Sequence, residues 1–282
     1  MELLYLGTAA AEAIPGMFCD CRFCKTAKAL GGKEYRMRSG AVINGELMID
    51  FSPDVHISSE KAGIELRKIK NIIFTHSHPD HCNAADLQYR GYGYCYFDGQ
   101  LDDKLHTYGN RAVEAVVTRA LKEKYDKYSV DFTYIEPYVP QDIGGYTVTP
   151  LSVFHANEDA YIYLIEKDGK RMLYGHDTGI FIDKTFEYLA GKRCDLISLD
   201  CTMGYQSAET GHMGFPANLK VKERLMNLGT ADKRTIFVSH HFSHNGLTLH
   251  KGTEELMGPR GFEVSYDGKT FVCRYDKTKI YD

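Results

Sequence analysis

The sequence has no long apolar run and no excess of charge of one sign. No segment approaches the roughly 20 apolar residues that a membrane-spanning helix needs. The first residues, MELLYLGTAA, lack the charged start and the apolar length of a secretory signal. We therefore expect a cytoplasmic protein without membrane contact. The net charge is −4 and the lysines and arginines are dispersed, so no long nucleic acid is expected as a partner.

Low-complexity linkers and repeats of a fixed period are also absent from the sequence. The 282 residues, 43% of them hydrophobic, suffice for one large core, so residues 1–282 are predicted to form a single domain. The chain contains eight cysteines. In a reducing cytoplasm cysteines are more often thiols or metal ligands than disulfides, which favours a metal site where they cluster.

Strand-like runs and helical patterns alternate along the chain. The runs GAVI and ELMIDF are joined by Asn44 and Gly45, a dipeptide typical of a hairpin turn. The apolar spacing within residues 108–125 predicts a helix with Asn110 as its N-cap. The run FEVSYDGKTFVCRY predicts a last hairpin that turns at Asp267. These patterns indicate an α+β fold of two sheets with helices outside.

The densest group of candidate metal ligands follows the buried-strand pattern NIIFT. In FTHSHPDHCN these ligands are His76, His78, Asp80 and His81. Imidazole nitrogens and carboxylates suit borderline divalent metals. A loop leaving a strand end can turn His76 and His78 towards one ion and Asp80 and His81 towards another, so the spacing predicts two metals. The alternative, a hydrophilic loop with incidental histidines, does not explain this density of ligand types.

This cluster resembles the His-x-His-x-Asp-His signature of the metallo-β-lactamase fold superfamily. The resemblance implies an αβ/βα four-layer sandwich and further functional residues at strand ends. Asp50, which closes ELMID, matches a residue that supports the metal loop by hydrogen bonding. His155 closes LSVFH and matches a later ligand, and Asp177 in LYGHDTG matches a bridging carboxylate.

One branch of the superfamily is more similar, namely phosphodiesterases resembling the phosphoribosyl cyclic phosphodiesterase of bacterial phosphonate breakdown. That branch has Gly-Thr after the first strand, then small residues, a proline and Cys-x-Cys-x-x-Cys, and here this stretch is LGTAAAEAIPGMFCDCRFC. The late run FVSHHFSH offers His240, His241 and His244. In the branch, a structural-zinc histidine follows the last active-site histidine by three residues, which makes His241 the active-site ligand and His244 the zinc ligand.

Cys19, Cys21 and Cys24 would complete this structural zinc site with His244. Three thiolates and one imidazole form a closed tetrahedral set, which leaves no position for water. Such a site would tie the N-terminal loop to the metal-bearing loop and couple zinc binding to local folding. The alternative is a redox pair of Cys21 and Cys24, but the sequence around them does not resemble thioredoxin.

The resemblance implies two divalent catalytic metals, zinc or manganese or iron, besides the structural zinc. The expected ligands are His76, His78 and His155 for the first metal, Asp80, His81 and His241 for the second, and Asp177 as the bridge. A hydroxide bridging two such ions would attack a phosphodiester. Catalysis is expected to depend on Asp80 and on His212 in GHMG, which the branch resemblance suggests as a general acid or phosphate contact. The alternative for His212 is an ordinary loop histidine.

The Tyr-rich segment at residues 87–108 is predicted to be an insertion or active-site flap, with a β-hairpin packed on the sheet as the alternative. Because this segment would shape the pocket, we expect a small or cyclic phosphodiester without naming it further. The alternatives are a lactone or thioester hydrolase using the same metals, and a non-hydrolytic accessory protein of cofactor biosynthesis. A tRNA-processing nuclease would need a basic arm, which the sequence does not show. A homodimer is the general expectation for the assembly.

Overall fold

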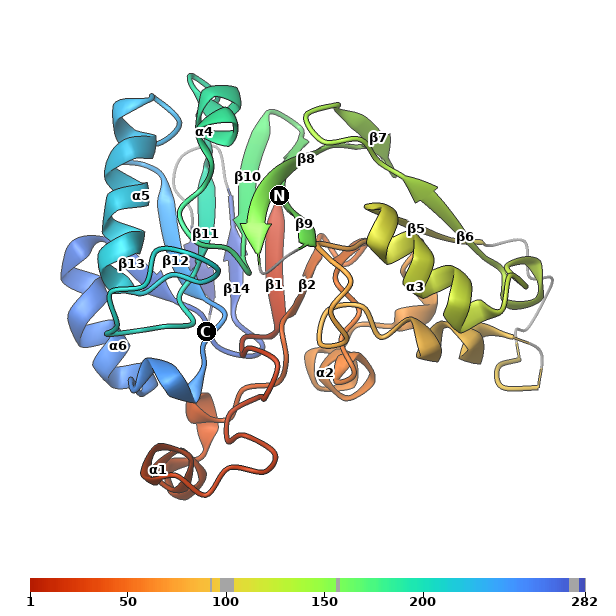
Figure 1. Cartoon of the computed structure of the whole chain (residues 1–282), viewed down its shortest axis with the longest axis horizontal. Coiled ribbons are helices and arrows are strands. Elements are labelled where there is room, and N and C mark those ends of the chain that lie inside the picture. Colours follow the sequence, from red (N-terminus) through yellow and green to blue (C-terminus); the bar gives the residue numbers. More distant parts are fainter. Residues whose placement is uncertain (92, 97–103, 156–157, 274–278, 282) are drawn as a thin grey trace.

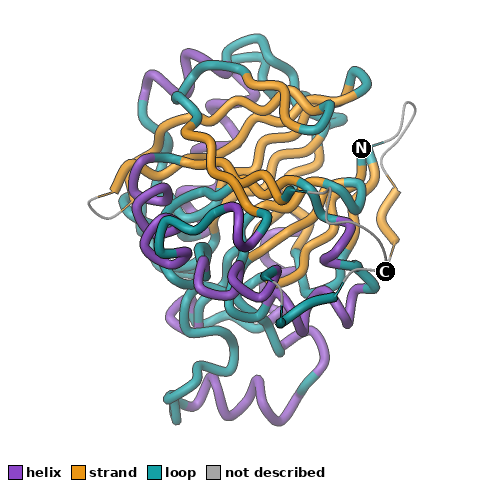
Figure 2. The backbone as a smooth tube through the Cα atoms, turned by 90° about the vertical axis from the view of Figure 1, so that its right-hand side faces the viewer, coloured by secondary structure: helices purple, strands orange, loops and turns teal. Residues whose placement is uncertain are grey.

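The computed structural model of this chain describes residues 1–91, 93–96, 104–155, 158–273 and 279–281. Two β-sheets lie face to face, and helices cover the outer face of each (Figure 1). The resulting order of helix, sheet, sheet and helix confirms the predicted four-layer α+β sandwich. In the side view the strands gather in the middle of the molecule (Figure 2). Within the described ranges, no helix has the length and apolar character needed to cross a membrane.

The first sheet has the strand order β15-β14-β1-β2-β3-β4-β5-β6. Its strands are β1 (Glu2–Gly7), β2 (Gly40–Ile43), β3 (Leu47–Ile49), β4 (Asn71–Ile73), β5 (Leu105–Gly109), β6 (Val130–Tyr134), β14 (Thr270–Val272) and β15 (Lys279–Tyr281). The strands β3, β4, β5 and β6 run parallel. The hairpin between β2 and β3 forms as predicted, because Asn44 and Gly45 both adopt the left-handed φ that this turn requires.

The second sheet has the order β13-β12-β11-β10-β9-β8-β7. Its strands are β7 (Gln141–Ile143), β8 (Tyr146–His155), β9 (Glu158–Lys167), β10 (Lys170–Gly175), β11 (Leu196–Asp200), β12 (Ile236–His240) and β13 (Phe262–Val264). The strands β7 to β10 are antiparallel, and β10 to β13 are parallel. The carboxyl ends of β10, β11 and β12 therefore meet at one edge, where several of the candidate metal ligands lie.

Helices with one apolar side cover the outer faces. The first sheet carries α2 (Val55–Ala62) and α3 (Arg111–Leu121), and the second carries α4 (Asp183–Leu189), α5 (Phe215–Asn227) and α6 (His250–Met257). In α3 the residues Val113, Val117 and Leu121 recur at helical spacing and are fully buried against the first sheet. The side chain of Asn110 accepts a hydrogen bond from the N–H of Val113 at 2.9 Å, so the predicted N-cap is confirmed.

The helix α1 (Arg22–Leu30) projects from the body in both views (Figures 1 and 2). Only two of its residues, Cys24 and Ala27, are buried. So short a helix with so little buried apolar surface needs another anchor. The remaining short elements are the 3-10 helices η1 (Gly32–Glu34), η2 (Leu66–Lys68), η3 (Ala84–Arg90), η4 (Asp126–Tyr128), η5 (His244–Gly246) and η6 (Gly258–Arg260).

The prediction of a last hairpin that turns at Asp267 is wrong. β13 pairs with β12 in the second sheet, whereas β14 pairs with β1 in the first, so the turn between them passes from one sheet to the other. The carboxylate of Asp267 accepts hydrogen bonds from the hydroxyl of Thr8 and the N–H of Met37, both at 2.6 Å. These contacts tie the turn to the first sheet, and local turn propensity could not reveal them.

The core between the sheets is rich in tyrosine. Tyr5, Tyr163 and Tyr174 are fully buried. The hydroxyl of Tyr163 donates to the carbonyl of Phe74 at 2.5 Å, and the hydroxyl of Tyr5 lies 2.6 Å from that of Ser198. Because a buried hydroxyl is costly unless it is bonded, these contacts specify how the two sheets face each other.

The Tyr-rich segment at residues 87–108 is only partly described, since residues 92 and 97–103 lie outside the described ranges. Its described parts are the end of η3, residues 91, 93–96 and 104, and the strand β5, which is parallel to β4 and β6. The rings of Tyr89 and Tyr94 meet edge to face at 5.2 Å and are 51% and 64% exposed. A role of this segment as a flap stays a prediction.

Candidate metal centre

Strand ends of both sheets bring the candidate ligands to one edge of the sandwich. Asp50 follows β3, the loop from His76 to His81 follows β4, Asp177 lies after β10 and His241 follows β12. β3 is parallel to β4, and β10 and β12 are both parallel to β11, so within each sheet these strand ends lie together. Asp50, Asp177 and His241 have φ values of 62°, 53° and 59°. This left-handed conformation is uncommon outside glycine and turns the chain sharply out of each strand.

The first group of ligand atoms comes from His76, His78 and His155 and lies within 4.8 Å. The Nε2 of His155 is 3.3 Å from the Nδ1 of His78. The Nδ1 of His155 lies 3.1 Å from the carbonyl of Gly211, so it is the protonated nitrogen and Nε2 keeps its lone pair for a metal. The Nε2 of His76 is buried with no hydrogen-bond partner among the described residues, a costly arrangement that a metal ion would relieve.

The second group comes from Asp80, His81, Asp177 and His241, whose ligand atoms also lie within 4.8 Å of one another. The Nε2 of His81 is 3.2 Å from Oδ2 of Asp80 and 2.5 Å from Oδ2 of Asp177. The Nε2 of His241 is 3.1 Å from the same Asp177 oxygen and 3.3 Å from the Nε2 of His81. Imidazoles and carboxylates converging in this way suit a divalent metal.

Asp177 lies between the two groups. Its Oδ2, already close to His81 and His241, is 3.7 Å from the Nε2 of His76, and its Oδ1 is 3.7 Å from the Nε2 of His155. This is the position that the resemblance implied for a bridging carboxylate. The structure thus brings all seven predicted residues together and sorts them into the two predicted groups, while their binding of metal stays a prediction.

Polar side chains behind the ligands orient two of the histidines. The Oδ2 of Asp50 is 2.7 Å from the Nδ1 of His81, the supporting contact that the resemblance implied. For His241, the hydroxyl of Thr202 and Oδ2 of Asp200 lie 2.8 and 3.4 Å from Nδ1. An acceptor at Nδ1 favours the tautomer in which Nε2 faces the metal.

Asp200 is a candidate functional residue that the sequence interpretation missed. It is fully buried, and its carboxylate accepts hydrogen bonds from the hydroxyl of Thr202 and the N–H of Met213, both at 2.8 Å. It also lies 3.2 Å from the Nδ1 of His212. One signal could have revealed it, because Asp200 closes the run DLISLD just as Asp50 closes ELMID.

His212 lies at the rim of the centre, with 31% of its side chain exposed. Its Nδ1 is 3.4 Å from Oδ1 of Asp177, and its ring is nearly parallel to that of His241 at 5.9 Å. Burial disfavours the protonated ring, but the contacts with Asp200 and Asp177 outweigh it and raise the pKa of His212. A raised pKa favours the proton-donating form that a general acid needs.

The centre concentrates negative charge in the interior. Burial disfavours the protonated ring of His81, yet Asp177, Asp50 and Asp80 outweigh it and hold the pKa of His81 well above its ordinary value. Burial would raise the pKa of Asp177, but His241 and His81 hold it well below. Ionised carboxylates in this setting require compensating positive charge. Protons on His81 and His241 can supply it, and divalent cations would take the place of those protons when the histidines bind as neutral ligands, so the residues present fit a two-metal site.

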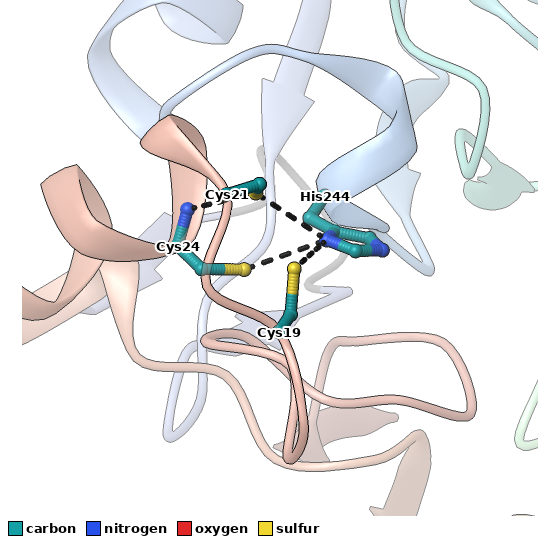
Figure 3. A group of neighbouring side chains, drawn as sticks. All are labelled: Cys19, Cys21, Cys24 and His244. Atoms are coloured by element: carbon teal, nitrogen blue, oxygen red, sulfur yellow. Dashed lines mark hydrogen bonds between the residues drawn. The ribbon is translucent and has the colours of Figure 1, made fainter.

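The cysteine cluster forms a second candidate metal site (Figure 3). The Sγ atoms of Cys19, Cys21 and Cys24 lie 3.1, 3.7 and 3.4 Å from the Nδ1 of His244. The N–H groups of Gly16 and Cys24 donate to the Sγ atoms of Cys24 and Cys21, at 3.3 and 3.4 Å. Three sulfurs and a nitrogen that converge in this way match the closed donor set of structural zinc. The structure brings the four residues together as predicted, and zinc in the site stays a prediction.

The two-sheet sandwich with paired His/Asp groups at its edge defines the class of metal-dependent hydrolases with the metallo-β-lactamase fold. A family model described as the Beta-lactamase superfamily domain matches residues 46–241. The chain belongs to this superfamily.

Several solved structures share the fold. A diphosphatase from the PhnP family superposes with a TM-score of 0.75 and 22% identity, covering 95% of both chains. Zinc-bound PqqB from Methylobacterium extorquens superposes with a TM-score of 0.72 and 19% identity, covering 97% of this chain and 100% of PqqB. The short form of human tRNase Z gives 0.68 and 15%, with coverage of 97% and 100%. At these identities the similarity establishes the fold.

One curated relative is an octanoyltransferase from Porphyromonas gingivalis (strain ATCC BAA-308 / W83). The two are 24% identical over 294 aligned residues, which cover 100% of this chain and 54% of that protein. The chain therefore spans about half the length of the curated relative that it matches.

Proposed function

We propose that this protein hydrolyses a small or cyclic phosphodiester with two divalent metals. The observation that carries the proposal is the pair of ligand groups that meet at Asp177. Bound ions would polarise the phosphoryl group, lower the pKa of the attacking water and stabilise the attacking and leaving oxygens. Zinc, manganese and iron all suit this donor set.

The chain's own residues hold and orient this arrangement. Contacts at Nδ1 fix the orientation of three histidine rings. The carbonyl of Gly211 orients His155, Asp50 orients His81, and Thr202 orients His241. Activity is expected to depend on Asp80 as well, because its carboxylate completes the second ligand group. Each group takes two residues from the loop after β4 in the first sheet and the rest from the second sheet, so the site exists only in the folded sandwich.

Two observations support a phosphodiester as the substrate. The chain shares its fold over 95% of its length with a diphosphatase of the PhnP family. It also carries the Cys3His cluster, which the sequence resemblance connects with a phosphodiesterase branch. A small substrate is favoured over RNA because the net charge is −4 and the lysines and arginines are dispersed along the sequence.

His212 is expected to protonate the leaving oxygen. Replacing it with alanine should lower kcat by about 100-fold or more for a diester with an alkoxide leaving group, the usual contribution of a general acid. The loss should be much smaller for p-nitrophenolate, which leaves without a proton. Steady-state kinetics on both diesters and elemental analysis of the variant provide the measurement.

A suitable control is His56→Ala, because His56 is an exposed histidine in α2 and belongs to neither ligand group. It should keep full activity on both diesters. Equal losses on the two leaving groups would argue against proton donation by His212. Lost metal in His212→Ala would instead identify His212 as a ligand.

A second candidate function is hydrolysis of an acyl ester or thioester. The similarity of the whole chain to about half of an octanoyltransferase favours it. The same ligand groups would suit an acyl carbonyl as well as a phosphoryl group, because bound metals polarise both. An octanoyl thioester is therefore the most informative acyl substrate to assay.

One panel of assays separates these functions. The protein, loaded with zinc or manganese, is assayed with bis(p-nitrophenyl) phosphate, a five-membered cyclic phosphodiester, a lactone and an octanoyl thioester. Diester turnover that is lost in Asp80→Ala supports the proposal. Turnover of the thioester alone supports the second candidate. Full metal content with no turnover of any substrate rejects both and favours a non-hydrolytic accessory role.

A further inference from the structure

Two histidines lie directly behind the metal centre, in the core between the sheets. His176 precedes Asp177 and His240 precedes His241 in the sequence. Both histidines are buried, with 1% and 0% exposed. Their rings stack, with centroids 4.0 Å apart and planes inclined by 19°. Neither histidine belongs to a ligand group, but each directly precedes a residue that does, Asp177 or His241.

The stack is built over Ser198 in β11, the strand between β10 and β12. The Nε2 of His176 is 2.6 Å from the Ser198 hydroxyl, which is also 2.6 Å from the hydroxyl of Tyr5. The ring of Tyr5 in turn stacks on His240 at 4.5 Å and 25°. A side chain as small as serine leaves room for rings from the two neighbouring strands to meet. The column thereby links β1 of the first sheet to three strands of the second.

Two serines determine the tautomer of His240. The hydroxyl of Ser265 donates to the carbonyl of Ser239 at 3.0 Å, so it accepts from the Nδ1–H of His240, also at 3.0 Å. The Nε2 of His240 then accepts from the hydroxyl of Ser39 at 3.1 Å. With both nitrogens bonded, the ring cannot turn without leaving a buried polar atom unsatisfied.

Asp177 and His241, which follow these histidines, need contacts that hold their backbone in place. Asp177 and His241 hold φ values of 53° and 59°, which residues with side chains keep only when their surroundings determine the backbone. They must also keep the Nε2 of His241 3.1 Å from Oδ2 of Asp177. A buried ring one residue before each ligand restrains the backbone at the point where it leaves the strand.

We propose that His176 and His240 are positioning residues, and that the hydrogen bonds that hold their stacked pair in place set the separation of Asp177 and His241 for the second metal. The inference rests on the proposed two-metal site. It assigns a role to residues that contact neither metal nor substrate. If the pair merely filled the core, any side chain of similar size and packing would serve as well.

The test compares metal binding by His240→Phe and His240→Gln. Phenylalanine keeps the aromatic stack and loses both hydrogen bonds, whereas glutamine keeps a donor and an acceptor. We expect His240→Phe to bind the last zinc or manganese ion about 10- to 100-fold more weakly, the usual effect of losing a residue that supports a ligand. His240→Gln should recover part of this loss. Affinity is measured by titrating metal-stripped protein with zinc or manganese against a chelating indicator.

The matched control is Tyr146→Phe, which likewise keeps a buried ring and loses its hydrogen bonds, here those with Asn44 and Glu46 at the turn between β2 and β3. Its metal affinities should equal those of the unchanged protein. A folded His240→Phe protein with unchanged affinity for every metal would overturn the inference.

Should His240→Phe fail to fold, Ser198→Ala decides the question. This variant removes the hydroxyl shared by Tyr5 and His176 and leaves all three rings in place. A clear weakening of the last metal supports positioning, and unchanged affinity overturns it. Because the readout is metal binding, a protein that binds two metals in this centre without cleaving diesters would refute the proposed reaction and leave the positioning role intact.

Discussion

Replacing Asp177 with asparagine is expected to abolish diester hydrolysis and to weaken both catalytic metals together. The Asp177 carboxylate contacts His76 and His155 of one group and His81 and His241 of the other. The asparagine amide has the same shape as the carboxylate but carries no charge. Its NH2 group takes the position of one carboxylate oxygen and, as a hydrogen-bond donor, repels a cation. Losing an outer partner of a metal ligand lowers activity by up to about 100-fold. Asp177 is a proposed ligand itself, so we expect kcat/KM to fall by at least about 100-fold.

Elemental analysis and kinetics measure this effect together. Metal content should fall from about three ions per chain towards about one, the remaining ion being the zinc of the cysteine cluster. The control is Asp126→Asn, whose carboxylate is 93% exposed and contacts only the Lys104 ammonium among the described residues. Loss of a single metal with the other bound at full affinity would contradict the bridging position of Asp177.

Replacing Cys24 with serine is expected to release the structural zinc and to lower the melting temperature. Cys24 is the buried member of the cluster, and a zinc ion there would join the N-terminal loop to His244 in η5. A ligand present at 100 to 1,000 times its Kd stabilises the folded state by about 2.7 to 4.1 kcal/mol. For a chain of this size that corresponds to a drop of about 5 to 15 °C.

Differential scanning calorimetry and zinc content check this expectation. The control is Cys95→Ser, because Cys95 is a half-buried thiol outside the cluster. The control should keep the zinc and the melting temperature of the unchanged protein. If Cys24→Ser retained a chelator-resistant zinc and its melting temperature, the cluster would not be a structural zinc site. If thiol oxidation of Cys21 and Cys24 reproducibly changed activity, the redox alternative would be favoured.

The main ligands could be predicted from sequence because each belongs to a short local pattern. One dense run after a buried strand contains His76, His78, Asp80 and His81, so their proximity follows from the sequence alone. His155 and Asp177 were identified only through the order of motifs that the family resemblance supplied. The choice of His241 over His240 came from the same source, and the structure directs His241 to the metal group and His240 into the core.

Apart from the contact of Asp50 with His81, which the resemblance implied, the contacts that orient the ligands could not be predicted in this way. Asp200 contacts His212 and His241, which follow it by 12 and 41 positions, and no local pattern links such distant residues. The pairing of His176 with His240 depends on a serine in the strand between them. The prediction of the last hairpin was wrong for the same reason, because the partners of β13 and β14 lie in different sheets.

The sequence by itself determined the α+β class, the hairpin at Asn44 and Gly45, the cap at Asn110 and the ligand types, since local periodicity and residue chemistry encode these. The family resemblance supplied the two ligand groups and the position of Asp177 between them, and only the tertiary structure decided how closely their atoms approach, which side chains orient them, and how the cysteines lie around His244. Those arrangements arise from strand order and from the stacking of two sheets. Both bring together side chains more than a hundred residues apart, where hydrogen bonding and buried charge, rather than sequence spacing, select the partners.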